Sequence, residues 1–563
     1  MNQTTPAIVA QNAVRRLPRW ALLLLCVAYV VPGFVGRAPW KSADMAGFGT
    51  MLELARGATG WLAPQLPGQS VGFDALLPYW LGAGAIHLLP WADPLLAARI
   101  PFALLLALTL AATWYGIYYL ARTPEAQPVA FAFGGEASPS DYARAMADGG
   151  LLALIACLGL AQLSHETTPA LAQLACASLT FYAVAAAPYR RWVPLVGVHL
   201  GLLGLALSGA PTLALLLGAG SAAICLLTYP AEARPQALRW MLAIASATLL
   251  AAAAASLLDL WRWRIADPGM AGGWREWRSL GRLLLWFTWP AWPLAVWTLW
   301  RWRRQWQHRH LALPLWFAGV AVLATLTTYS ADRSLLLALP ALATLAAFAL
   351  PTLRRSVAAL VDWFTLLFFT GCAIVIWVVW ISMQTGVPAK PAANLARLVP
   401  GFVPGFSVLD CLLALLATLA WGWLVMWRVG RNRKAIWKSL VLPAGGAVLG
   451  WVLVMTLWLP PLDFARSYRV LAHNVMARVP GAQCVEIYGL HVGQIAALRY
   501  HTPLQLLPAT RGDARCDWLL VDSEAQVPLP NDVDLQQWVF NAALRRPSDK
   551  TDDLLLYRRL PRP

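Results

Sequence analysis

Charge is scarce in this chain. Only 13% of its 563 residues are Asp, Glu, Lys or Arg, whereas 59% are hydrophobic. This composition excludes an ordinary soluble domain. Long apolar runs recur over most of the length, and a helix needs roughly 20 apolar residues to cross a bilayer. The sequence therefore predicts an all-α polytopic membrane protein.

Metal-binding motifs are also missing. No CxxC or HExxH pattern is present, so a zinc site is not predicted. Six of the eight cysteines fall in apolar runs, where they act as small packing residues: Cys26, Cys157, Cys176, Cys225, Cys372 and Cys411. Cys484 and Cys516 lie in the tail. They form a disulfide if the tail is in an oxidising compartment and their geometry allows it, and otherwise stay free.

About thirteen transmembrane spans are predicted, and the first is a retained helix because no small-residue cleavage site follows it. Their approximate ranges are 20–36, 95–120, 151–163, 170–187, 193–207, 212–228, 241–257, 283–300, 311–328, 335–350, 357–381, 408–427 and 441–459. The residues at 123–150 are rich in Pro, Gly and Ser and predict a flexible connection.

The formal net charge of +17 is explained by the basic loops of a membrane protein. Binding of nucleic acid is a much weaker explanation. Lys and Arg gather in alternate gaps between spans, which the positive-inside rule places in the cytoplasm. An odd number of spans then puts the N-terminus inside and the tail outside. We expect a multi-pass membrane protein with a C-terminal domain on the outer face.

One outer gap, 258–282, breaks the charge rule. It mixes arginines, including Arg262, with tryptophans. One interpretation is a surface for a lipid head group or an anionic glycolipid, because Trp favours the interface and Arg pairs with phosphate. The alternatives are an interfacial helix whose arginines snorkel to water, or a miscounted span.

The tail changes character and predicts a second domain at 461–563, after a membrane domain at 1–460. Short apolar runs at 484–488, 518–522 and 554–557 predict strands. Stretches at 464–478, 492–500 and 534–544 are typical of helices. This alternation indicates a small α/β domain, which serves as a lid, an acceptor platform or a stabilising cap.

The first outer loop carries unexpected charge: Asp44, Glu53, Arg56 and Asp74 lie between Trp40 and Trp80. The pattern from 45 to 56 predicts an amphipathic helix at the interface, and 75–89 predicts a second amphipathic or re-entrant segment. Charge beside a membrane favours a chemical role. The structural alternative is that Asp44 or Ser42 caps the first helix.

These residues carry a family resemblance. Asp44, Gly-Trp-Leu-Ala-Pro at 60–64, Pro-Tyr-Trp at 78–80 and Ala-Arg-Ile at 98–100 resemble the first external loop of the GT-C glycosyltransferases that use lipid-linked sugars. The chain is most similar to the aminoarabinose transferase and protein mannosyltransferase branch. The overall layout fits too, but specific motifs cover only this loop and a few later positions.

The resemblance implies that Asp44 is the catalytic base or orients it. Met45 stands where the family usually has a second acid, which disfavours a paired-carboxylate metal site. Asp74 stands in place of the lysine of a Glu-Lys-Pro triplet, so Lys41 is the candidate to meet the donor phosphate. Later positions similar to the family add Glu166 as a second catalytic acid and Arg333 as a phosphate ligand.

Further candidates are weaker. His165 and Asp74 are candidates for contacting substrate, and Arg262 and Lys390 for binding the lipid phosphate. Each polar group also has a simpler explanation: Glu166 could cap the following helix, and Arg333 could pair with Asp332 in water.

The implied activity is transfer of a sugar from a polyprenyl-phosphate donor to lipid A, another glycolipid or a protein. A single displacement predicts inversion at the anomeric carbon. We expect a monomer surrounded by membrane lipids, with no cofactor, a divalent metal being possible but not favoured. The alternatives are a transporter or flippase of lipid-linked sugars, and a non-catalytic relative that binds glycolipid.

Overall fold

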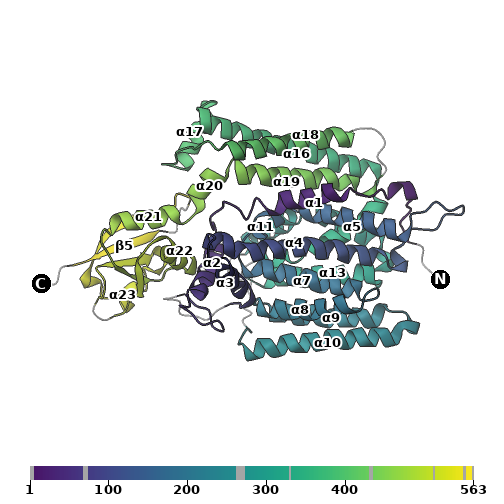
Figure 1. Cartoon of the computed structure of the whole chain (residues 1–563), viewed down its shortest axis with the longest axis horizontal. Helices are drawn as coiled ribbons and strands as arrows, with labels where there is room; N and C mark the ends of the chain where they lie inside the picture. The colour runs from purple at the N-terminus through teal and green to yellow at the C-terminus, as the bar shows by residue number, and fades with distance from the viewer. Residues whose placement is uncertain are drawn as a thin grey trace.

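The computed structural model describes residues 5–66, 74–261, 273–328, 331–429, 435–511, 514–548 and 553–560. Figure 1 shows a helical bundle with a smaller α/β unit at one end. Within the described ranges, eight helices are long and apolar enough to cross a membrane: α4 (Pro94–Ala121), α7 (Pro169–Ala186), α9 (Pro211–Thr228), α10 (Arg234–Leu257), α13 (Arg309–Thr327), α16 (Arg355–Thr385), α18 (Val408–Val429) and α19 (Val441–Thr456). The chain is a multi-pass membrane protein, as predicted.

The predicted count of thirteen spans is not confirmed. Three more apolar helices are shorter: α1 (Arg19–Val30), α8 (Trp192–Leu207) and α15 (Leu339–Ala349). The predicted span at 335–350 is divided between α14 (Ala331–Leu336) and α15. The span at 283–300 is divided between α11 (Trp274–Phe287) and α12 (Ala291–Arg301). Pro290 lies between α11 and α12, where it lacks the N–H that would continue a helix.

The connection predicted at 123–150 is wrong in its second half. α5 (Pro139–Ala156) already begins at Pro139, and the Ser138 side chain caps it by accepting the Asp141 N–H. Proline at the first helical position after a serine cap is a strong start signal. The predicted span at 151–163 therefore consists of the end of α5 and a single turn, α6 (Leu160–Leu163).

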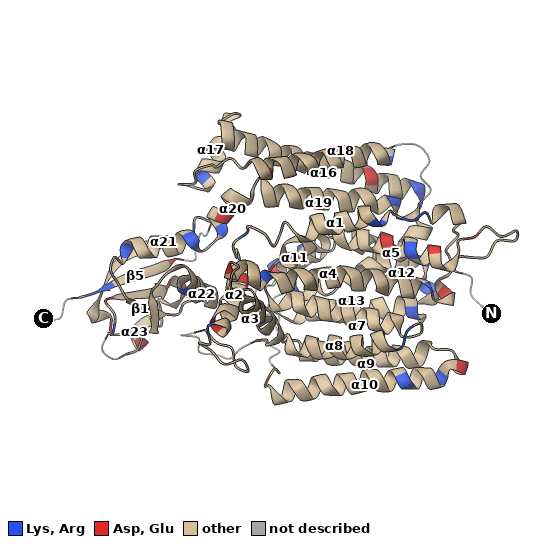
Figure 2. Cartoon of the chain, viewed as in Figure 1, with Lys and Arg blue, Asp and Glu red and all other residues tan. Residues whose placement is uncertain are grey.

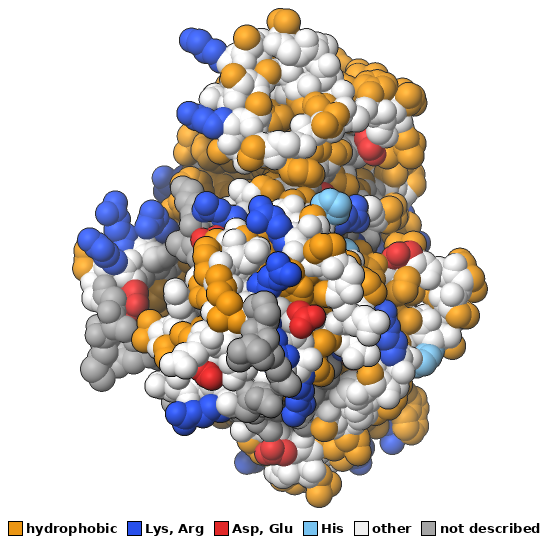
Figure 3. All heavy atoms as spheres, turned by 90° about the vertical axis from the view of Figure 1, so that its left-hand side faces the viewer, with side chains coloured by type: hydrophobic (Ala, Val, Ile, Leu, Met, Phe, Trp, Pro, Cys, Tyr) orange, Lys and Arg blue, Asp and Glu red, His pale blue; other side chains and the backbone are white. Residues whose placement is uncertain are grey.

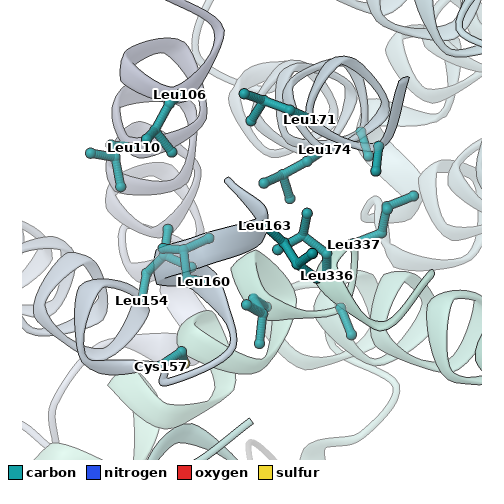
Figure 4. Packing of buried hydrophobic residues seen from close by; sticks show 14 of the residues in the cluster. Leu106, Leu110, Leu154, Cys157, Leu160, Leu163, Leu171, Leu174, Leu336 and Leu337 are labelled. Atoms are coloured by element: carbon teal, nitrogen blue, oxygen red, sulfur yellow. The ribbon is translucent and has the colours of Figure 1, made fainter. Parts of the chain in front are cut away.

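The turn α6 lies inside the leucine-rich core. Figure 4 shows Leu160 and Leu163 among side chains from α4, α7 and the end of α14, including Leu106, Leu174 and Leu336. Burial of a leucine contributes about 1.5–3 kcal/mol. This packing fixes the loop at 164–168 that follows α6.

Two helices of the first outer loop lie between the bundle and the α/β unit, as Figure 1 shows: α2 (Ser42–Ala55) and α3 (Leu77–Leu88). Both helices were predicted, but the amphipathic pattern expected for α2, with one polar face in water, is wrong. Ten of its 14 residues are buried, Asp44 and Glu53 included. The helix packs against α3 and against α22 (Val492–His501) of the α/β unit.

The α/β unit contains one five-stranded sheet in the order β2-β1-β3-β5-β4. β1 (Cys484–Tyr488), β2 (Gln505–Pro508) and β3 (Trp518–Asp522) are parallel, and α22 connects β1 to β2. β4 (Trp538–Leu544) and β5 (Leu554–Arg559) complete the sheet as antiparallel strands. The other helices outside the bundle are α17 (Ala389–Leu398), α20 (Leu459–Arg466), α21 (Arg469–Arg478) and α23 (Leu529–Asp532).

The sequence predictions for this unit are mostly confirmed. β1, β3 and β5 lie where strands were expected, and α21 and α22 lie where helices were expected, whereas α20 begins at Leu459 and overlaps the predicted stretch 464–478 only at its end. The predicted helix at 534–544 is wrong, because 538–544 is β4 and pairs with β5 over its whole length. β2 was not predicted. A disulfide joins Cys484, the first residue of β1, to Cys516, with their Cα atoms 5.7 Å apart.

Candidate functional site

Glycine lets α2 approach its neighbours closely. A Cβ at Gly47 would lie 2.3 Å from the carbonyl oxygen of Thr167, and a Cβ at Gly49 would lie 2.4 Å from the Cβ of Ala496 in α22. Across the same contact, a Cβ at Gly493 would lie 2.7 Å from the carbonyl oxygen of Ser42. The start of α2 is therefore held between the loop at 164–168 and the start of α22.

Asp44 is fully buried at this contact. Its Oδ1 accepts hydrogen bonds from the backbone N–H of Thr167 at 2.7 Å and from the Thr167 hydroxyl at 2.8 Å. Its Oδ2 accepts from Nη2 of Arg37 at 3.3 Å. Arg37 is buried as well, and the same nitrogen donates to the carbonyl of His165 at 2.6 Å. The alternative that Asp44 caps α2 is wrong, because neither it nor Ser42 makes a capping hydrogen bond there.

Glu166 lies beside two cations. Its Oε2 accepts from Nη2 of Arg333 at 3.4 Å, and its Oε1 lies 3.7 Å from Nζ of Lys41. Oε1 has no hydrogen-bond partner among the described residues. Lys41 also pairs with Asp332 at 3.4 Å. Glu166 thus contacts both Lys41 and Arg333, and all three residues were predicted from separate parts of the sequence.

Burial and, to a smaller extent, the negative charge of Asp44 raise the pKa of Glu166, while Lys41, Arg333 and Arg37 oppose the shift, and the net result is a pKa of about 7. Desolvation disfavours the charged form of a carboxyl group. A carboxyl with a pKa near neutral can accept and release a proton at physiological pH.

A cavity of about 720 Å³ opens next to these groups. Lys41 and Arg333 line it, whereas Asp44 and Glu166 do not, because both carboxylates lie behind it with no exposed surface. Its other polar lining comes from Ser42, Thr50, Asp74, Tyr79, Thr168, Gln173, Ser334 and His491. Most of a ligand in this cavity would therefore face polar groups, and two of them are cations that contact Glu166.

Three helices begin at the same cavity. The first turns of α2, α7 and α22 contribute Ser42, Pro169 and Val492 to its lining. The start of a helix carries free backbone N–H groups and a partial positive charge, so it attracts anions. Together with Lys41 and Arg333, these three ends make the cavity suited to a phosphate.

The remaining predicted residues are more widely distributed. Asp74 lines the cavity and accepts a 2.5 Å hydrogen bond from the Tyr79 hydroxyl. His165 is fully buried, with its ring against Trp451 and Phe34 and its Nε2 3.0 Å from the carbonyl of Tyr29, so it faces the core rather than the cavity. Lys390 is exposed on α17 and does not line the cavity. Arg262 lies outside the described residues.

Sequence reasoning missed Arg37 and Thr167. Arg37 directly follows the first predicted span on the outer side, where the positive-inside rule disfavours arginine. This departure from the positive-inside rule could have marked Arg37 as a candidate functional residue. Nothing in the sequence marks Thr167, because its role depends on a contact with a residue 123 positions away.

One group of side chains at the rim resembles a metal site. The ligand atoms of His491, Asp522 and Glu524 lie within 4.8 Å of one another. However, the His491 side chain accepts a hydrogen bond from the backbone N–H of Gln494, which leaves the proton on the other ring nitrogen. That nitrogen, Nε2, faces Asp522 and Glu524 at 3.9 and 4.0 Å. Only one ring nitrogen therefore faces the two carboxylates, because the other is already engaged at the start of α22.

A multi-pass helical bundle that holds a charged cavity against an α/β unit is the architecture of the GT-C fold. Two solved structures share it with this chain: ArnT from Cupriavidus metallidurans bound to undecaprenyl phosphate, and the same protein in the apo state. In both comparisons the TM-score is 0.57, and the match covers 96% of this chain and 97% of the other at 14% identity. The GT-C fold is therefore confirmed. No family model and no curated protein matches the sequence.

Proposed function

We propose that this protein transfers a sugar from a polyprenyl-phosphate donor to an acceptor in the bacterial cell envelope, on the periplasmic face of the inner membrane. The observation that carries the proposal is the cavity at which Lys41 and Arg333 both contact Glu166 and three helices begin. The fold shared with a structure that contains undecaprenyl phosphate supports a lipid-phosphate donor.

The cations suit the leaving group. A phosphate that enters the cavity competes with Glu166 for Arg333 and Lys41, whose side chains are 25% and 38% exposed. A guanidinium can hold phosphate oxygens in a bidentate manner and stabilise charge as the sugar–phosphate bond breaks. When the two cations turn toward the phosphate, the carboxylate behind them is uncovered.

Glu166 is then the better candidate for the general base. Its Oε1 is free of hydrogen bonds, whereas both oxygens of Asp44 are occupied by Thr167 and Arg37. In the proposed step the acceptor hydroxyl attacks the anomeric carbon, its proton moves to Glu166, and the lipid phosphate leaves with the bonding electrons. A single displacement of this kind inverts the anomeric centre. Asp44 positions the loop that carries Glu166.

The acceptor class follows from the resemblance to aminoarabinose transferases, which favours lipid A over another glycolipid or a protein. No cofactor is required by this step. The proposal predicts that only donors with a polyprenyl phosphate are used, because the cavity recognises the phosphate.

A transfer assay tests the proposal. Purified protein is mixed with radiolabelled polyprenyl-phosphate sugars and an envelope lipid extract, and the parent is compared with Glu166→Gln, Asp44→Asn and Arg333→Gln. We expect Glu166→Gln to lose at least about 100-fold in rate, the lower range for removing a general base, and the other two variants to transfer more slowly than the parent. The exposed acid Glu232 supplies a matched control, since Glu232→Gln should transfer normally.

Two results would contradict the proposal. Absence of transfer by the parent with every donor would favour a glycolipid-binding protein without catalytic activity. Movement of labelled donor across a reconstituted bilayer, without transfer, would favour a flippase.

A further inference from the structure

A second cavity, of about 590 Å³, shares no lining residue with the first. It lies where the chain leaves α1, at 34–39, and where α4 begins. Residues of the α/β unit close it, including Arg469, Tyr500 and His501. The sequence resemblance and the proposed transfer reaction assign it no role.

The notable lining residue is Arg99, which is 2% exposed. Its Nη1 donates to the backbone carbonyls of Phe34 and Arg37. Nε and Nη2 are buried and have no hydrogen-bond partner among the described residues. An unsatisfied buried donor costs about 1–3 kcal/mol, and more on a charged group, so this guanidinium is arranged to bind something else.

The charged side chains that line this cavity are mostly cationic, although the carboxylates of Asp44, Asp463 and Asp93 also act on Arg99. Arg469 is exposed at the same cavity, and Arg37 is already paired with Asp44. Asp93 is the acidic residue in the lining, and its Oδ1 is used to cap α4, at 2.9 and 3.1 Å from the N atoms of Leu95 and Leu96. Asp93 makes no ion pair with Arg99. The cavity therefore has a net positive lining, with donors left over.

A mostly apolar groove of about 550 Å³ lies farther along the same two helices, and Arg19, the first residue of α1, also lines it. It is lined by Leu22, Cys26 and Val30 of α1 and by Ala107, Leu110 and Ala111 of α4. Val31, in the groove, is three residues from Phe34, in the polar cavity. On α4, Arg99 and Ala107 are separated by about 12 Å at 1.5 Å per residue. Leu23 and Val27, on the rim of the groove, are more than half exposed, so it opens toward the surrounding lipid.

We propose that Arg99 and Arg469 bind the phosphate of an anionic membrane phospholipid, one of whose acyl chains lies in the groove between α1 and α4. A polar cavity with spare cationic donors above an apolar groove matches a lipid with a charged head and a hydrocarbon tail. Basic pockets between transmembrane helices bind such head groups. This site is separate from the one at Lys41 and Arg333, and it does not depend on the transferase proposal.

Native mass spectrometry of the full-length protein in detergent tests the site. The protein is titrated with phosphatidylglycerol, with phosphatidylcholine of the same chains, and with inorganic phosphate. We expect phosphatidylglycerol to bind at least tenfold more tightly than phosphatidylcholine, and inorganic phosphate to compete only weakly because it cannot use the groove. Arg469→Gln and Arg99→Gln should each weaken phosphatidylglycerol binding about tenfold. Arg99→Lys should keep part of it.

The controls separate this site from the first cavity. Arg333→Gln, and Arg397→Gln on the exposed helix α17, should leave phosphatidylglycerol binding unchanged. Equal binding of the two phospholipids would overturn the proposal, and so would unchanged binding in both Arg469→Gln and Arg99→Lys. Full competition by inorganic phosphate would indicate a site for a free anion only. Displacement of the phospholipid by equimolar undecaprenyl phosphate, lost in Arg333→Gln, would show that the two cavities form a single site.

Discussion

Glu166 and Asp44 are neighbouring carboxylates in different environments. Asp44 accepts three hydrogen bonds through its side-chain oxygens, from Arg37 and from two donors of Thr167. Glu166 is equally buried but keeps one oxygen without a hydrogen bond. An oxygen without a hydrogen bond can accept a proton from a substrate, whereas an oxygen held by donors cannot do so without breaking those bonds. We therefore assign to Asp44 the positioning of the loop at 164–168, and to Glu166 the role of proton acceptor.

The pH dependence of transfer should report on Glu166. Its pKa is raised to about 7, so below that pH the carboxyl is protonated and cannot act as a base. We expect kcat/KM to rise with pH and to level off above about 7. Glu166→Gln should remove this inflection and lower the rate by a factor of roughly 10² to 10⁴. The measurement is the initial rate of label transfer between pH 5 and pH 9.

Asp44→Asn provides the comparison. It should lower the rate yet keep an acidic inflection, displaced toward lower pH because one negative charge beside Glu166 is gone. An inflection that survives in Glu166→Gln and disappears in Asp44→Asn would assign the base to Asp44 instead.

Among the elements, the position of α2 decides the geometry of the site. It carries Lys41 and Asp44 at its start, and farther along Glu53 accepts a 2.6 Å hydrogen bond from Arg499 of α22. Glu53 and Arg56 are two of the unexpected charged residues between Trp40 and Trp80. In the structure Glu53 is a buried link between the first outer loop and the α/β unit, and Arg56 pairs with its other oxygen at 3.4 Å.

A methyl group at Gly47 should disturb this arrangement. In Gly47→Ala the new Cβ would lie 2.3 Å from the Thr167 carbonyl, so α2 or the loop must move and the Asp44–Thr167 hydrogen bonds must lengthen. We expect a loss of stability of about 1–3 kcal/mol, as for other overpacked sites, and a lower transfer rate. Thermal unfolding in detergent and the transfer assay measure the two effects.

Gly84 in α3 is the matched control, because a Cβ there would meet no atom within 4 Å. Gly84→Ala should be neutral or stabilising by up to about 1 kcal/mol, since alanine favours a helix over glycine. Similar melting temperatures for the two variants would show that the close contact at Gly47 does not hold α2 in place.

For the whole molecule, the distribution of charge predicts an orientation in the membrane. Figure 2 shows a largely uncharged middle of the bundle, with Lys and Arg at the end away from the α/β unit. Figure 3 shows the opposite face, where the α/β unit also carries several basic side chains. The positive-inside rule counts short loops between spans, so the end with the interhelical loops is the one we expect in the cytoplasm.

Alkaline phosphatase fusions test this orientation. The enzyme should be active when fused to the C-terminus and inactive when fused after Arg122, in the short loop that follows α4. The disulfide between Cys484 and Cys516 gives a second readout. It should be formed in protein isolated from cells, because a domain outside the cytoplasm is not exposed to cytosolic reductants. The reverse activities, with both cysteines reduced, would place the α/β unit in the cytoplasm.

The sequence by itself determined that this is a membrane protein, and it determined which residues form α2, β1, β3 and α22. These depend on local patterns of apolar residues, which act within one turn or one strand. Local patterns fail for residues 538–544, which were predicted as a helix but form a strand because they pair with β5. The tertiary structure alone decided that Lys41, Glu166 and Arg333 meet, and that Asp44 is enclosed by Arg37 and Thr167. Those contacts join side chains up to 167 residues apart, and only the packing of α2 against the loop after α6 brings them within reach.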